Sequence, residues 1–349
     1  MKLKFLKFTS LLIVALVVIL SCENDDDVNF RPAELRDRAE QQLTDNQELL
    51  AYLGSHYYNS GFFETGTNHK YTDIVITELQ PSQNVPEGHT LLIDAVLPAE
   101  TTTFEDTTYE YYVLRINQGG GESPNFTDEV RVRYEGFLEE TGEVFDGVAT
   151  PIDFRMQQSL GLFEGGVIRG WQLVLSSFNT AAGFSSNNGI VDYNDFGLGV
   201  MFLPSGLGYF GTPIPGVPSY SNLIFKFELL QFEVDDHDGD GIPTFLEDTD
   251  ENIDVLDDDA DEDTFPDFLD PDDDNDGVLT QNEIITNQYI VDTNMNQDEP
   301  VLAITEFEVS RFETDGIITI NTVTFFDTNG NMIFDHLDED VTEDYSDDN

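Results

Sequence analysis

Hydrophobic residues recur with two different spacings along the chain. Near the start the spacing is that of a helix, and in the middle it is that of a strand. Residues 31–57 carry apolar side chains at helical spacing among charged and amide residues, with Pro32 near the beginning. The apolar positions are Leu35, Ala39, Leu43, Leu49, Leu50 and Leu53. This spacing predicts an amphipathic helix with a possible break at Asp45 and Asn46. The helix could pack against the rest of the chain or pair with a second chain, and the sequence leaves both open.

The strand period begins after an irregular stretch. Residues 58–103 are rich in Gly, Thr, Pro and Asn and contain only short β-like runs, so they predict an irregular lead-in with some β structure. Residues 108–116 have the composition of a strand, which Gly119–Gly121 ends. Hydrophobic and polar residues alternate again around Val132 and Phe227, which predicts a half-buried antiparallel sheet. A short helix after Gly170 is expected to pack across this sheet.

The first residues have the composition of an export signal. Three lysines within the first seven residues precede the apolar run 11–20, which is too short for a transmembrane helix and suits a signal peptide over residues 1–21. Cys22, the only cysteine, follows this run and resembles the lipidation site of bacterial lipoproteins. An incidental cysteine near an ordinary cleavage site is the alternative. Several acyl chains on Cys22 would anchor the chain stably to a membrane.

The acidic run Glu23–Asp27 follows directly. It resembles the tether of surface-exposed lipoproteins in some Gram-negative bacteria, and a solvated linker is the alternative. Together with the signal peptide and Cys22, this run predicts a location in the cell envelope, as an outer-membrane lipoprotein.

Charge divides the chain into two parts. Its 70 acidic and 14 basic residues give a net charge of −56, which argues against nucleic acid and anionic membrane surfaces as partners and favours cations. About half of the acidic residues follow Asp235, where Arg311 is the only Lys or Arg. This change of composition predicts a domain boundary near residue 235.

Residues 236–247 have the spacing of a calcium-binding loop. Oxygen ligands at positions 1, 3 and 5, a glycine at position 6 and a glutamate at position 12 can surround a hard cation, and calcium fits such a shell better than magnesium. The predicted ligands are Asp236, Asp238, Asp240, the carbonyl of Ile242, and Glu247. The pattern recurs as Asp272, Asp274, Asp276 and Glu283, less completely as Asp259, Asp261, Asp263 and Asp270, and most weakly as Asp327, Asn329, Asn331, Asp335 and Asp338.

The spacing between these loops bears on the type of calcium domain. The second loop ends so close to the third that no room remains for the helices of paired EF-hands, so the array is more similar to thrombospondin type 3 repeats. A solvated, disordered tail is the alternative for so acidic a segment. Affinities of extracellular modules are about 10⁻⁴–10⁻³ M, which predicts calcium as a permanent structural ion rather than a switch.

Five segments of the middle region carry a family resemblance. In order along the chain they are Glu129–Gly136, Val144–Gly147, Val167–Trp171, Pro204–Gly211 and Leu223–Leu230. Together they resemble an FKBP-type peptidyl-prolyl cis-trans isomerase domain. The resemblance implies an α+β fold, with an antiparallel sheet wrapped on a short helix. It also implies rotation about the bond before proline, which needs no cofactor and has proline-containing polypeptides as substrates.

The resemblance also implies roles for individual residues. Trp171 would form the floor of a proline pocket, and Asp146 and Tyr209 would form its polar rim. The backbone N–H of Ile168 would hold a substrate carbonyl, the Tyr209 hydroxyl would bind the peptide beside the rotating bond, and Val217 would cap the pocket. The walls would be Tyr134, Phe145, Phe154, Val167, Ile168 and Phe225. The single Trp of the chain beside several glycines independently indicates a close approach of ring and backbone.

Two departures from the family pattern flank the expected pocket. Residues 176–194 form a polar insertion, and Phe210 stands between Tyr209 and Gly211 where compact relatives continue directly from Tyr to Gly. They leave a second interpretation open, a non-catalytic module that holds proline-containing segments in a surface or outer-membrane assembly. The predicted organisation is a signal peptide at 1–21, a lipidated tether with helix and lead-in at 22–103, an isomerase domain at 104–234 and calcium-binding repeats at 235–349.

Overall fold

The computed structural model describes residues 34–158 and 166–346 and divides the chain into two compact units at Arg36 and Asp37. The predicted signal peptide and Cys22 lie outside the described residues, and everything below concerns the second unit. No helix among the described residues has both the length and the hydrophobicity needed to cross a bilayer.

A six-stranded antiparallel sheet is the centre of this unit, with the strand order β4-β5-β10-β11-β6-β7. The strands are β4 (Glu100–Phe104), β5 (Thr107–Asn117), β6 (Glu129–Leu138), β7 (Val144–Arg155), β10 (Gly197–Leu203) and β11 (Leu223–Glu233). Every residue of β10 is buried, so both faces of the sheet are covered at its middle. The sheet is antiparallel, as the alternation around Val132 and Phe227 predicts, but it is covered on both faces at its middle rather than half-buried.

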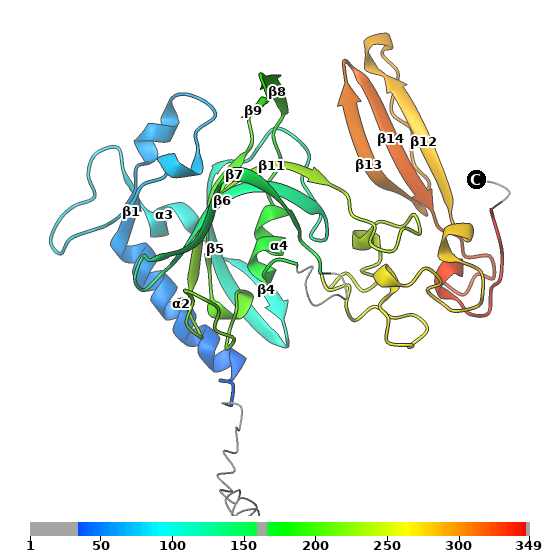
Figure 1. Ribbon diagram of the computed structural model, residues 1–349, viewed down its shortest axis with the longest axis horizontal. Coiled ribbons are helices and arrows are strands. Elements are labelled where there is room, and N and C mark those ends of the chain that lie inside the picture. The colour runs from blue at the N-terminus through cyan, green and yellow to red at the C-terminus, as the bar shows by residue number, and fades with distance from the viewer. Residues whose placement is uncertain (1–33, 159–165, 347–349) are drawn as a thin grey trace, which may run out of the picture. The chain divides into compact units, whose positions relative to one another are not determined.

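Helix α4 (Arg169–Leu175) packs on one face of the sheet and α2 (Arg38–Ser55) on the other (Figure 1). Alternate residues of each strand point to opposite faces, so neighbours such as Phe225 and Ile224 enter different cores. The second core is completed by α3 (Leu92–Val96) and a small sheet of β1 (His56–Tyr58), β2 (Ile76–Glu78) and β3 (Thr90–Leu91). The N-terminal helix thus packs on the chain's own sheet, which is the first of the two possibilities left by the sequence.

Helix α2 differs from its prediction in three respects. It is continuous through Asp45 and Asn46, because Asp45 is fully buried and hydrogen-bonded rather than a helix breaker. The helix begins at Arg38, with the Asp37 carboxylate accepting a hydrogen bond from the N–H of Glu40 at 2.9 Å. Leu43, which the spacing places on the apolar face, is 67% exposed.

The polar insertion at residues 176–194 folds into a hairpin of β8 (Gly183–Asn187) and β9 (Ile190–Asn194), which projects from the larger sheet (Figure 1). Its base is fixed at the carboxyl end of β11. There the N–H of Ala181 donates to the carbonyl of Leu230 at 3.1 Å, and the Tyr193 hydroxyl donates to Gln231 at 2.9 Å.

The acidic region contains a sheet that the sequence analysis missed. Strands β12 (Ile285–Asp292), β13 (Glu306–Thr314) and β14 (Ile317–Thr324) form an antiparallel sheet in the order β12-β14-β13. Asp315 and Gly316 join β13 to β14, both with positive φ (51° and 78°), and an Asp-Gly pair between alternating residues is a strong hairpin signal.

Short 3₁₀ turns occupy Ser60–Glu64, Tyr71–Asp73, Ser205–Leu207, Thr244–Leu246, Asp267–Leu269, Thr280–Asn282, Thr293–Met295 and Asp335–Leu337.

A buried carboxylate joins α2 to the turn that leads to Tyr209. Asp45 accepts hydrogen bonds from the N–H and the hydroxyl of Ser205 at 2.9 and 2.6 Å, and from the Gln41 amide at 2.6 Å. We expect Asp45→Ala to lower the free energy of unfolding by about 3 kcal/mol, because buried donors lose their acceptor. Urea unfolding followed by Trp171 fluorescence measures this change. Leu43→Ala, on the exposed side of the same helix, should change stability by less than about 0.5 kcal/mol, and an equal loss in both variants would contradict the assignment.

Candidate functional site

Trp171 lies at the centre of a group of aromatic rings on the α4 side of the sheet. The rings of Tyr134, Phe225 and Phe154 stand nearly perpendicular to the indole, with centroids 4.9, 5.4 and 6.0 Å away and interplanar angles of 88°, 87° and 85°. Edge-to-face pairs of this kind are favourable, so they fix the orientation of the indole. Trp171 is only 4% exposed.

The strands bring these rings together because their positions share one face of the sheet. Tyr134 lies on β6, Phe154 on β7 and Phe225 on β11, all with side chains in the core that contains Trp171. Phe145, half-buried near the start of β7, adds its ring to Phe225 at 5.6 Å and 85°. The five aromatic residues that the resemblance assigned to floor and walls are therefore neighbours in space.

Asp146 lies at the edge of this aromatic group, where its charge also acts on Tyr209. The Tyr134 hydroxyl donates to Asp146 at 2.6 Å, and the N–H of Gly147 donates to the other oxygen of Asp146 at 2.8 Å. Burial raises the pKa of Tyr134, and Asp146 raises it further. Burial and then Asp146 likewise raise the pKa of Tyr209. Both phenols therefore keep their protons near neutral pH and can act as hydrogen-bond donors.

The remaining pocket residues come from the entry to α4 and from a loop before β11. Val167 and Ile168 are half-buried against the same core, and Ile168 precedes α4 in extended conformation. Its N–H has no acceptor among the described residues. Val217, 2% exposed, forms a small antiparallel bridge with Ile214 and packs into the core, and Gly216 has a positive φ where the loop passes Phe145.

Phe210 faces away from this aromatic group. Its backbone is left-handed with φ 46°, and its buried ring packs against Tyr220 and under the Arg38 guanidinium, which lies 4.3 Å from the ring centroid. Tyr209 packs into the Trp171 core instead. The additional residue thus adds a contact with α2, whereas Tyr209 lies against the core that contains Trp171.

The inserted hairpin is also remote from the aromatic rings. Its base contacts Leu230 and Gln231, five and six residues beyond Phe225 on β11. At about 3.4 Å per residue of a strand, this places it roughly 17 Å along the strand from the pocket. The hairpin of the insertion therefore lies toward the opposite end of β11, whereas Phe178 near the start of the segment 176–194 packs in the core that contains Trp171.

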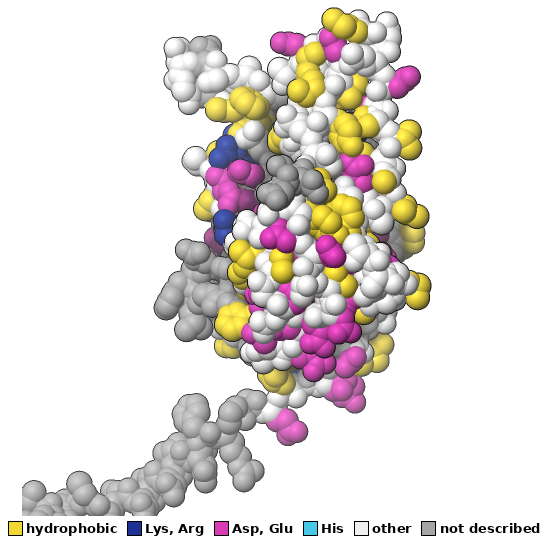
Figure 2. Space-filling model, turned by 90° about the vertical axis from the view of Figure 1, so that its right-hand side faces the viewer, with side chains coloured by type: hydrophobic (Ala, Val, Ile, Leu, Met, Phe, Trp, Pro, Cys, Tyr) yellow, Lys and Arg dark blue, Asp and Glu magenta, His cyan; other side chains and the backbone are white. Residues whose placement is uncertain are grey.

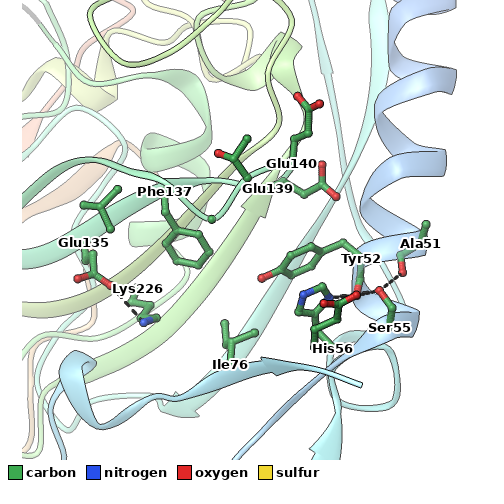
Figure 3. Close-up of a pocket in the computed structure, with 14 residues that line it drawn as sticks. Ala51, Tyr52, Ser55, His56, Ile76, Glu135, Phe137, Glu139, Glu140 and Lys226 are labelled. Carbon is green, nitrogen blue, oxygen red and sulfur yellow. Dashed lines mark hydrogen bonds and ion pairs between the residues drawn. The ribbon is translucent and has the colours of Figure 1, made fainter. Parts of the chain in front are cut away.

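A cavity of about 590 Å³ lies on the other face of the sheet (Figure 3). Tyr52 and His56 stand on one side of it, and the ion pair of Lys226 and Glu135, 3.2 Å long, stands on the other. Glu139 and Glu140 add further carboxylates to its lining. This polar, carboxylate-rich composition differs from that of the aromatic group around Trp171.

The acidic region brings carboxylates together in the manner of a cation site. Oxygens of Asp238, Asp240, Glu247 and Asp273 all lie within 4.8 Å of one another. Three of these residues were predicted ligands, but Asp273 was missed because it is the second residue of the loop 272–283, a position outside the ligand pattern. Asp273 therefore links two loops that are far apart in the sequence.

Electrostatics shows why these carboxylates need a positive partner. Two charges 4.8 Å apart at an effective dielectric constant near 20 repel by about 3 kcal/mol. Burial and then the neighbouring acids raise the pKa of Asp240 to about 8 and of Asp273 to about 10. Both oxygens of Glu247 and of Asp273 are buried and have no hydrogen-bond partner in the described part of the chain. Hard carboxylate oxygens of this kind fit Ca²⁺ or Mg²⁺ rather than a soft metal.

The other first-loop residues take a structural position. Asp236 accepts hydrogen bonds from the N–H groups of Gly239 and Gly241 at 2.7 and 3.1 Å, and it lies outside the cluster. The Ile242 side chain is buried in a small core with Ile284. Asp236 thus shapes the turn that carries Asp238 and Asp240.

Two further predicted loops gather their first three acids. Asp272, Asp274 and Asp276 form one such cluster, and Asp259, Asp261 and Asp263 form another. Glu283 is fully buried, and burial followed by Asp274, Asp276 and Asp272 raises its pKa to about 9. Asp270 lies outside the second cluster, and burial raises its pKa, with Asp263 and Asp261 among the further causes.

The fourth loop forms the same turn without gathering carboxylates. Asp327 accepts hydrogen bonds from the N–H groups of Gly330, Asn331 and Met332, and the amides of Asn329 and Asn331 donate to Asp338 at 2.8 and 2.7 Å. Asp335 accepts from Thr328 and Tyr345 instead.

The face shown in Figure 2 carries a dense group of Asp and Glu side chains in its lower part and few Lys or Arg.

Comparison with known proteins supports the resemblance in the middle region. Residues 120–181 match the family model of FKBP-type peptidyl-prolyl cis-trans isomerases. The FKBP-type peptidyl-prolyl cis-trans isomerase FkpA of Escherichia coli K12 is 30% identical over 118 residues, which are 33% of this chain and 35% of that protein. The FkpA of Escherichia coli O6:H1 gives the same values. The chain thus spans about a third of the length of these curated relatives.

Solved structures of the same family are also similar to this chain. The crystal structure of FkpA from Escherichia coli is 26% identical, covers 38% of this chain and 51% of its own, and has a TM-score of 0.28. A peptidyl-prolyl cis-trans isomerase from Pseudomonas syringae pv. tomato is 15% identical, covers 57% and 98%, and has a TM-score of 0.33. The sequence match to the FKBP-type peptidyl-prolyl cis-trans isomerase family is therefore confined to the middle region of the chain, with residues 120–181 matched by the family model.

Proposed function

We propose that this chain is a peptidyl-prolyl cis-trans isomerase that acts on exported polypeptides. The observation that carries the proposal is the group of perpendicular rings around Trp171, with the hydrogen bond between Tyr134 and Asp146 and the protonated Tyr209 at its edge. The match of residues 120–181 to the isomerase family supports the same activity.

The chemistry needs no nucleophile or metal. Rotation about an Xaa-Pro bond has a barrier of roughly 18–20 kcal/mol, because the planar amide is stabilised by charge separation. A water-poor aromatic pocket favours the less charge-separated twisted amide, so it binds the transition state better than the planar substrate. A thousandfold acceleration requires about 4 kcal/mol of such preference.

Two hydrogen-bond donors would orient the substrate in the pocket. The backbone N–H of Ile168, at the entry to α4, would bind a carbonyl of the peptide, and the Tyr209 hydroxyl would bind the peptide beside the rotating bond. The non-catalytic alternative drew its support from the insertion at residues 176–194. Since that hairpin is anchored at Leu230 and Gln231, we favour the isomerase.

We further propose that calcium stabilises the acidic region and that the chain is an envelope lipoprotein anchored through Cys22. The carboxylate cluster of Asp238, Asp240, Glu247 and Asp273 supports a hard cation, and the array of similar loops supports several. The carboxylates of the two loops repel one another. One ion bound by carboxylates from both loops would attract them all and so hold the two loops together. The calcium would have a structural role, because rotation about the amide bond does not require it.

Removal of one hydroxyl tests the pocket. We expect Tyr209→Phe to lower kcat/KM for Xaa-Pro peptides about tenfold, because one hydrogen bond to the substrate is lost. A protease-free assay of cis-trans exchange on the full chain, with the residue before proline varied, measures this. Tyr57→Phe removes a hydroxyl from β1 on the other side of the sheet and should leave the rate unchanged. A folded wild-type chain without acceleration would rule out the enzyme and leave the binding module.

Removal of one carboxylate charge tests the calcium site. We expect calcium near 1 mM to raise the stability of the wild-type chain by about 1.4 kcal/mol per site with a Kd near 0.1 mM, and Glu247→Gln to lose most of one such increment. Differential scanning calorimetry with calcium and with EGTA measures the difference. Glu313→Gln makes the same charge change on exposed β13 and should keep the full increment. Equal thermal stability in calcium and EGTA would contradict a structural cation.

Replacement of the cysteine tests the anchor. We expect the wild-type chain to be found with the membrane fraction and to incorporate labelled fatty acid, because acylated Cys22 partitions into lipid. Cys22→Ser should lose both properties. Fatty-acid labelling that persists in Cys22→Ser would overturn the assignment of this residue.

A further inference from the structure

A fifth acidic loop lies between the first two predicted ones, at residues 248–258. It was not among the predicted loops: Ile253 stands at its glycine position, and its position 12 falls on Asp259, which opens the next predicted loop. Asp248 nevertheless accepts a hydrogen bond from the N–H of Ile253 at 2.8 Å, just as Asp236 accepts one from Gly241 at 3.1 Å. The sixth residue has a positive φ in both loops, 68° at Ile253 and 100° at Gly241. The two loops therefore have the same turn.

The carboxylates of this loop converge as well. Oxygens of Asp248, Asp250 and Asp258 lie within 4.8 Å of one another. Asp258 is 7% exposed, and its Oδ1 accepts hydrogen bonds from the N–H and hydroxyl of Thr249. Its Oδ2 is buried and has no hydrogen-bond partner among the described residues. A buried carboxylate oxygen without a donor, beside two other carboxylates, points to a cation as its partner.

The loop also contacts the isomerase domain. The Arg169 guanidinium donates from Nη1 to the carbonyl of Ile253 and from Nη2 to the carbonyl of Asn252 at 3.4 Å. Nη1 also donates to Gln172 at 3.1 Å, and the guanidinium lies 5.2 Å from the centroid of the Phe104 ring. The Ile253 side chain packs against the core that contains Trp171.

We propose that Asp248, Asp250 and Asp258 bind a hard divalent cation, and that this ion holds the loop 248–258 in the shape that anchors Arg169 at the start of α4. The proposal rests on the proposed use of cations by the acidic region, and it adds a site and a consequence. Arg169 directly follows Ile168, whose N–H would bind substrate, and it lies two residues before Trp171. Occupancy of the cation site would therefore set the order of one wall of the proline pocket.

The charges are compatible with this arrangement. Arg169 is 9% exposed and makes no ion pair within the described part of the chain. Burial lowers its pKa, and Asp254, Asp248 and Asp257 oppose that effect. The segment 248–258 carries six acidic residues, so a bound divalent ion leaves it net negative and still attractive to the guanidinium. The ion would remove repulsion within the loop without expelling Arg169.

The test compares two neutralising substitutions in the same loop on the full chain. Asp258→Asn removes the charge of the buried ligand, whereas Asp257→Asn removes an exposed charge outside the cluster. Equilibrium dialysis with Ca²⁺ alone counts bound ions. We expect Asp258→Asn to bind one calcium fewer per chain and Asp257→Asn to bind the wild-type number. Equal numbers in Asp258→Asn and wild type would overturn the site.

The coupling to α4 has its own measurement. Trp171 is the only tryptophan, so its fluorescence and its quenching by acrylamide report the order of α4 without an activity assay. We expect calcium to reduce quenching in the wild type and in Asp257→Asn. The response should be lost in Asp258→Asn. It should also be lost in Arg169→Lys, because a lysine cannot donate to both carbonyls with the fork geometry of a guanidinium. Arg169→Lys should nevertheless bind the wild-type number of ions. A full response in Arg169→Lys would overturn the coupling.

These outcomes separate this inference from the proposed function. A wild-type chain that binds no calcium would contradict the proposed role of cations in the acidic region as a whole. A chain that binds calcium equally in wild type and Asp258→Asn would contradict only the fifth site. Neither readout depends on isomerase activity.

Discussion

The complete burial of β10 is the constraint on which the arrangement of residues 37–233 depends. A strand that is buried along its whole length requires cover on both sides of its sheet. Helix α4 covers one face and presents Trp171 to three aromatic rings, while α2 and the lead-in cover the other face. The aromatic site can form on one face because the second face is already closed by residues that precede the segment matched to the isomerase family.

The cover on the second face also includes polar contacts between the lead-in and the sheet. Glu228 lies on the α2 side of β11, is fully buried, and is balanced by Arg133 at 2.8 Å and by the N–H of Tyr71 at 3.0 Å. Such an ion pair contributes little by itself, but removal of either partner leaves a buried charge without compensation. The lead-in is therefore fixed to the sheet through specific polar groups as well as through apolar contact.

The sequence predicted those features that depend on local periodicity or on short ordered motifs. Alternation identified the antiparallel sheet, and the family motifs brought Tyr134, Phe145, Phe154, Trp171 and Phe225 into one group. The sequence did not predict the burial of Asp45, because an Asp inside a helical pattern is ordinarily exposed and its hydrogen bonds to the distant Ser205 depend on the tertiary fold. Asp273 was missed for the same reason, since its partners Asp238, Asp240 and Glu247 lie in another loop. The sequence does contain the hairpin signal at Asp315 and Gly316. The acidic composition around it predicted ligand loops, so no sheet was predicted there.

The acidic region and the region that matches the isomerase family place different demands on one short segment. The proposed rotation about a peptide bond needs an apolar pocket, whereas the acidic loops need positive charge nearby. Arg169 is common to both, since its backbone begins the helix that carries Trp171 and its guanidinium is bound by carbonyls of an acidic loop. A residue in this position cannot be exchanged for an apolar one without exposing two loop carbonyls, and it cannot move toward the carboxylates without displacing the first turn of α4. The two parts of the chain are therefore connected through the hydrogen bonds of Arg169, although the chemistry proposed for each part is independent of the other.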